Sequence, residues 1–155
     1  MNFIFHFLFN YLMIDVVLTN SWNHIILIFI LSVFIDIDHV PYLIRAGKNV
    51  LKKRFGSESR TRFHEIYGLA FFSLLLCALY FFADHAIIEI SAICVVMHLA
   101  IDFLTGKSAP FHPYSKNEIF LNIFPYGYKN KIIFEISSTI ILGVLFWLRI
   151  SPVWL

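Results

Sequence analysis

The chain has 155 residues, of which 59% are hydrophobic, 18% are aromatic and only 14% are charged. Its mean hydropathy is +0.77, whereas ordinary soluble domains are about 25% charged. This composition excludes a typical soluble globular domain and favours an integral membrane protein. The sequence also contains no Gly-rich phosphate loop, serine nucleophile elbow, internal repeat or nucleic-acid-binding module.

Five apolar segments predict an all-α fold, a polytopic membrane bundle that forms one domain over residues 1–155. The expected helices cover approximately 3–18, 22–40, 64–83, 86–105 and 131–150. Four of them reach the roughly 20 residues needed to cross about 30 Å of hydrocarbon. The first is shorter and polar in places, which suits a tilted span or a partly interfacial helix. No Lys or Arg precedes it, so we interpret it as a retained helix rather than a signal peptide.

The positive charges predict the orientation of the bundle. Of the 12 Lys and Arg residues, seven lie within 45–62 and four within 107–131. Basic loops face the cytoplasm, so both loops are expected on that side, joined by the hairpin of the third and fourth helices. The prediction is an amino terminus inside and a carboxyl terminus outside, in the inner membrane of a prokaryote.

On this topology the histidines and aspartates of four helices gather at the cytoplasmic end. His24 and His85 are expected elsewhere, because each lies at the opposite end of its helix. The residues expected at the cytoplasmic end are His6 on the first helix, Asp36, Asp38 and His39 on the second, His64 and Glu65 on the third, and His98 and Asp102 on the fourth.

Two pairs in this group have the spacing of a shared helical face. His98 and Asp102 are i,i+4, an arrangement that chelates one metal or lets the carboxylate orient the imidazole. Asp36 and His39 are i,i+3. Asp38 points about 100° away from His39 on a regular helix.

The proline at position 41 is expected to change the end of the second helix. It biases Val40 out of the helical region, which would unwind the last turn and swing Asp36, Asp38 and His39 inward.

A single carboxylate at the end of a membrane helix is usually a solvated interfacial residue. Several carboxylates that face one another repel unless a cation or protons compensate them, and a divalent metal does so most simply. Ionisable groups within a membrane also cost free energy and often mark functional sites. The cluster therefore indicates a metal site. Cys77 and Cys94 lie mid-helix and are expected to be small packing residues.

Three blocks of sequence resemble the signature blocks of the membrane-bound metal-dependent hydrolases (YdjM-like). They are FIDIDHVPY at 34–42, FHEIYGLAFF at 63–72 and MHLAIDFLTGKSAPFHPYS at 97–115, while the early FHFLF is similar to the Gly-His or Thr-His that opens family members. The family is itself distantly similar to helical zinc-dependent phospholipase C and single-strand nucleases. The order and spacing of these blocks resemble those of the family, and this resemblance implies a membrane-bound metal-dependent hydrolase.

The resemblance implies a set of candidate metal ligands or their immediate supports: His6, Asp36, Asp38, His39, His64, His98 and Asp102. This chain departs from the family pattern at Ile35, Ser59, Phe63 and Glu65. These departures leave open a weaker metal site or an inactive member, although Glu65 can itself serve as an oxygen ligand or a base.

The expected chemistry is hydrolysis by a metal-activated water. Mixed His and Asp ligands suit zinc, with manganese or iron as alternatives. Asp38 or Glu65 would accept a proton, while Arg60, Arg62 and Lys107 would hold an anionic phosphate oxygen. The expected partners are the lipid bilayer and a small-molecule or lipid-linked phosphoester, with no nucleic acid. There are two alternative hypotheses: a non-catalytic membrane protein with a structural metal, and a cation transporter.

Overall fold

The structure is a computed structural model that describes residues 3–18, 20–41, 44, 65–105, 108, 110–111, 114–115, 117–119, 121 and 128–151. Within these ranges it is all-helical, without strands, apart from one isolated antiparallel bridge between Ser108 and Ile119. The five α-helices are α1 (Phe3–Val17), α2 (Ile25–Phe34), α5 (Ile66–Leu79), α6 (His85–Thr105) and α7 (Tyr128–Ile150). In the part of the chain that the structure describes, the predicted all-α fold with five helices is confirmed.

The second predicted helix, 22–40, is divided into three parts. A 3₁₀ segment, η1 (Ser21–His24), precedes α2, and a second one, η2 (Ile35–His39), follows it. Asn20 makes the preceding turn with φ 66°, a left-handed conformation that asparagine tolerates. The expectation for Val40 was wrong, because it keeps helical angles (φ −59°, ψ −45°). The chain instead tightens its winding before Pro41, within η2.

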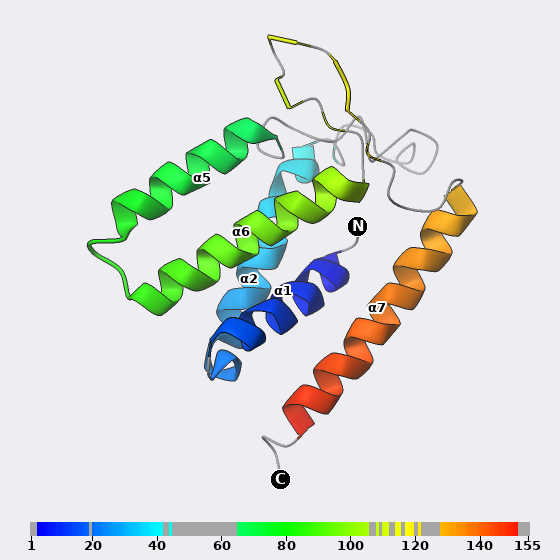
Figure 1. Ribbon diagram of the computed structural model, residues 1–155, viewed down its shortest axis with the longest axis horizontal. Helices are drawn as coiled ribbons and strands as arrows, with labels where there is room; N and C mark the ends of the chain where they lie inside the picture. Colours follow the sequence, from blue (N-terminus) through cyan, green and yellow to red (C-terminus); the bar gives the residue numbers. More distant parts are fainter. Residues whose placement is uncertain are drawn as a thin grey trace.

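Helices α1, α2 and α6 pack against one another and form the centre of the molecule. Helix α5 packs on α6, and α7 packs on α1, so these two helices lie at opposite edges (Figure 1). Helix α1 runs antiparallel to α2 and α6. The start of α1 and the ends of α2 and α6 therefore meet at one end of the bundle.

The three central helices contribute side chains in layers that are four residues apart. The deepest layer is apolar, the next contains two uncharged polar residues and a cysteine, and the third contains two histidines and an aspartate at the end where α2 and α6 finish. These layers are Ile14, Ile28 and Ile90; then Asn10, Ser32 and Cys94; then His6, Asp36 and His98. All of these side chains except Asp36 are fully buried. The isoleucines and Cys94 belong to one core cluster, so Cys94 packs as expected.

Fewer helices than expected have the length of a membrane span. Among the described residues, two are long and apolar enough by length and composition alone: α6 and the stretch Ile132–Ile150 of α7. Four were expected. The second helix falls short because 3₁₀ winding replaces its ends, and the third because α5 begins at Ile66 and ends at Leu79.

Helix α7 is joined to α1 near its carboxyl end. The ring of Phe146 packs edge-on against Phe7 and Tyr11, with centroids 5.8 and 4.8 Å apart. At the last turn, the Arg149 guanidinium donates a hydrogen bond to the carboxylate of Asp15. Helix α7 is otherwise little buried: in the most apolar 18 residues of its stretch Ile132–Ile150, no residue is buried within the protein.

Candidate metal centre

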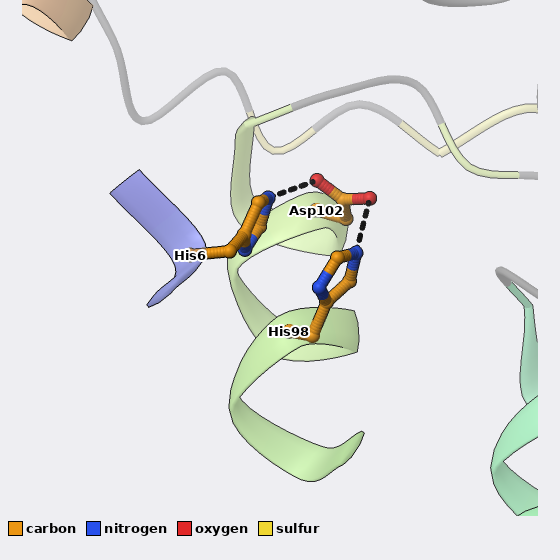
Figure 2. A group of neighbouring side chains, drawn as sticks. All are labelled: His6, His98 and Asp102. Atoms are coloured by element: carbon orange, nitrogen blue, oxygen red, sulfur yellow. Dashed lines mark ion pairs between the residues drawn. The ribbon is translucent and has the colours of Figure 1, made fainter. Parts of the chain in front are cut away.

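Three buried side chains from two helices converge at the end of the bundle (Figure 2). His6 points from α1 toward α6, where its Nε2 lies 3.5 Å from Oδ1 of Asp102. The other oxygen of Asp102, Oδ2, lies 3.7 Å from Nε2 of His98. One nitrogen or oxygen from each residue falls within 4.8 Å of the others. This group can hold a metal ion, which confirms a buried His/Asp cluster of the predicted type.

The spacing of these atoms suits a shared cation. Metal bonds from nitrogen and oxygen are about 2.0 to 2.2 Å long, so ligands around one ion lie roughly 3 to 4 Å apart. The two imidazole rings stack face to face, with centroids 3.8 Å apart and planes 16° from parallel. Each ring thus directs its Nε2 toward a different oxygen of the same carboxylate.

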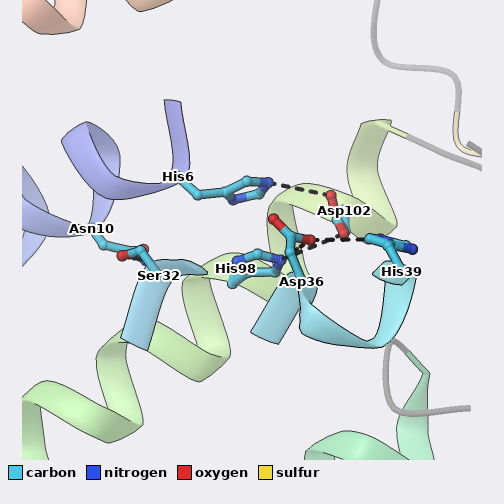
Figure 3. A network of polar contacts seen from close by, with 7 residues as sticks. All are labelled: His6, Asn10, Ser32, Asp36, His39, His98 and Asp102. Carbon is cyan, nitrogen blue, oxygen red and sulfur yellow. Dashed lines mark hydrogen bonds and ion pairs between the residues drawn. The ribbon is translucent and has the colours of Figure 1, made fainter. Parts of the chain in front are cut away.

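The 3₁₀ segment η2, which follows α2, brings a second carboxylate to the group (Figure 3). Oδ1 of Asp36 lies 3.2 Å from Nε2 of His98 and 3.6 Å from Nε2 of His39. Residues three apart eclipse in a 3₁₀ helix, so η2 places Asp36 and His39 on one face. Asp36 is the more exposed carboxylate, at 22% of its side chain against 6% for Asp102.

Backbone electrostatics also favour a cation here. The carboxyl ends of α2 and α6 and the amino end of α1 meet at this point. A helix carries a partial negative charge at its carboxyl end and a partial positive charge at its amino end, so two negative ends outweigh one positive end. Two carboxylates add to that charge in a largely buried environment, where solvent screens little. A bound cation offsets both contributions.

A polar pair lies one helical turn deeper than the imidazoles. The amide Nδ2 of Asn10 donates a hydrogen bond of 2.9 Å to Oγ of Ser32, and Figure 3 shows the two side chains meeting beside the rings. Asn10 is four residues from His6, and Ser32 is four residues from Asp36. The spacing of Asn10 to His6 was visible in the sequence; the role of Ser32 depends on the packing of α1 against α2.

Glu65 lies at the start of α5, where its carboxylate accepts a hydrogen bond from the hydroxyl of Ser108. It is not one of the three residues that form the metal-type group. Glu65 thus ties the beginning of α5 to the segment that follows α6. Its role as a base stays a prediction.

Several predicted site residues cannot be placed. His64, Arg60, Arg62 and Lys107 lie outside the described residues, as does the side chain of Asp38, although its backbone belongs to η2. His24 lies in η1 and His85 begins α6, and neither belongs to the metal-type group, as expected.

Comparisons with protein-family models, with curated proteins and with solved structures found no match.

Proposed function

We propose that this protein is a membrane-embedded, metal-dependent hydrolase that acts on a phosphoester. The convergence of His6, His98 and Asp102 in one buried group is the observation that carries the proposal. Three protein ligands with one further position are typical of catalytic zinc sites. The resemblance to the membrane-bound metal-dependent hydrolases points to the same chemistry.

The apolar surface supports a membrane location. Large hydrophobic side chains of α7 are exposed, among them Ile133, Ile140, Trp147 and Leu148. Exposed apolar surface of this extent usually marks contact with lipid or another protein. In the proposed orientation the His/Asp cluster faces the cytoplasm, at the depth of lipid headgroups, which favours an amphiphilic or lipid-linked phosphoester.

Each part of the site has a proposed role. The site would hold a divalent metal, with zinc the preferred candidate, and such a metal would lower the pKa of a bound water and so provide a nucleophile at neutral pH. His6, His98 and Asp102 hold the metal, while Asp36 and His39 line the more exposed side. Asp38 or Glu65 accepts a proton.

The anionic substrate needs positive charge at the same end of the bundle. The proposed partners of the phosphate oxygens are Arg60, Arg62 and Lys107. In the sequence the two arginines come shortly before α5, and the lysine comes shortly after α6. Arginine is well suited to this task, since its planar fork matches phosphate geometry.

A structural metal site is the second candidate. Oδ1 of Asp36 lies close to His98, so Asp36 is well placed to supply a fourth ligand. A metal with four protein ligands is coordinatively full and structural. A cation pathway is less favoured, because the layer of Ile14, Ile28 and Ile90 closes the centre of the bundle two turns below the imidazoles.

The test is a substrate screen on protein reconstituted in lipid nanodiscs. Zinc-loaded protein is offered phosphomonoesters, phosphodiesters and lipid-linked phosphoesters, and release of phosphate or alcohol is followed. Hydrolysis that is lost on chelation and restored by zinc is expected. A protein that retains zinc yet hydrolyses none of the three classes is a structural metalloprotein, and the hydrolase proposal fails.

A further inference from the structure

Asn10 has an unusual position for an uncharged polar residue. It is 0% exposed, it lies one turn below His6 on the same face of α1, and the layer of Ile14, Ile28 and Ile90 lies beneath it. Its amide nitrogen is bonded to Ser32, but its carbonyl oxygen Oδ1 has no hydrogen-bond partner among the described residues. An unsatisfied buried acceptor destabilises a folded protein.

A second unsatisfied atom lies one turn away on the same helix face. Nδ1 of His6 is buried and also lacks a hydrogen-bond partner within the described part of the chain. The other ring nitrogen, Nε2, lies 3.5 Å from Oδ1 of Asp102 but also lacks a hydrogen bond among the described residues, which leaves it available to a metal ion. Metal-binding histidines almost always bond through their second nitrogen, which fixes the tautomer and the ring orientation. His6 needs such a partner. Asn10, four residues later on the same face of α1, has an acceptor oxygen without a hydrogen bond among the described residues.

We propose that Asn10 is a positioning residue for His6, and that one buried water molecule bridges Oδ1 of Asn10 and Nδ1 of His6. The two atoms are not hydrogen-bonded to each other, and one group that accepts from Nδ1–H and donates to Oδ1 would satisfy both. A water is the smallest group with this property, and buried waters typically satisfy such pairs. Ser32 holds the amide of Asn10 in place from the opposite side.

The bridge serves the metal site in a definite way. A water that accepts from Nδ1–H and donates to Asn10 leaves the lone pair of Nε2 directed at the metal. The isoleucine layer keeps further water from entering from below, so the bridge stays ordered. The inference rests on the proposed metal site, because its effect is measured on metal binding.

The test compares the zinc affinity of Asn10→Ala with that of the parent protein, by competition with a chromogenic chelator in detergent micelles. We expect a loss of about 10- to 100-fold, the usual effect of removing an orienting partner of a metal ligand. Asn10→Asp keeps an acceptor oxygen at this position and should restore most of the affinity. Ser91→Ala is the matched control, because Ser91 is also a buried polar residue but bonds only to Ile87 of its own helix among the described residues.

Thermal unfolding of the metal-free variants separates positioning from a general loss of packing. If Asn10→Ala does not fold, Ser32→Ala provides the second variant, with an expected smaller loss of affinity because the amide of Asn10 is no longer fixed. If Asn10→Ala binds zinc as tightly as the parent protein, the inference about Asn10 fails while the proposed metal site stands. If only Ser32→Ala folds, an unchanged zinc affinity in that variant has the same meaning. A parent protein that binds no zinc overturns the proposed metal site and the inference together.

Discussion

Asp102 is the residue that both buried imidazoles share, since one of its oxygens faces His6 and the other faces His98. Replacing it with asparagine keeps its shape and removes its charge. We expect Asp102→Asn to lower zinc affinity by more than the roughly 10- to 100-fold that follows loss of a supporting residue. Chelator competition measures this. Glu89→Gln is the control, because Glu89 is exposed on the same helix about 20 Å away, and its zinc affinity should equal that of the parent.

Asp36 provides a second prediction, which separates an open metal site from a closed one. Its side chain is more exposed than that of Asp102, so solvent screens its charge more. Asp36→Asn should therefore reduce zinc affinity less than Asp102→Asn does, measured in the same competition. Equal losses in the two variants would make Asp36 a full ligand and favour a structural site.

At the scale of helices, the attachment of α7 rests on packing more than on its ion pair. Phe146 is in contact with two aromatic rings of α1, whereas the side chain of Arg149 is 63% exposed. Phe146→Ala should cost about 1 to 3 kcal/mol of stability, because it removes aromatic contacts and leaves a cavity. Arg149→Ala should have little effect, since exposed ion pairs contribute little. Thermal unfolding of both variants ranks them, and a larger effect for Arg149→Ala would be inconsistent with this view.

The sequence predicts the helices better than their ends and their register. Hydrophobic runs predict five helices, and the i,i+4 spacing of His98 and Asp102 places them on one face. The 3₁₀ winding at both ends of α2 has no clear local signal except Pro41, and the effect of that proline falls upstream of Val40. The pairing of Asn10 with Ser32 depends on the rotation of α1 relative to α2, which tertiary packing of the isoleucine layer sets.

At the scale of the whole molecule, the proposed orientation predicts which segments are accessible from outside. Single cysteines at Lys53 and Asn117, in a background without Cys77 and Cys94, should resist an impermeant thiol reagent in intact cells and react after permeabilisation. The basic loops lie on the cytoplasmic side in this account. Labelling of either position in intact cells would contradict the predicted orientation and would indicate that the His/Asp cluster lies on the outer face.

In the proposed site His6, His98 and Asp102 bind one metal ion together. X-ray absorption at the zinc edge of the zinc-loaded protein measures the ligands directly. We expect nitrogen and oxygen ligands at about 2.0 to 2.2 Å from the zinc, together with the more distant scattering of two imidazole rings. That imidazole scattering should decrease in His98→Ala. Zinc surrounded by oxygen alone, or a spectrum unchanged in His98→Ala, would contradict the proposed site.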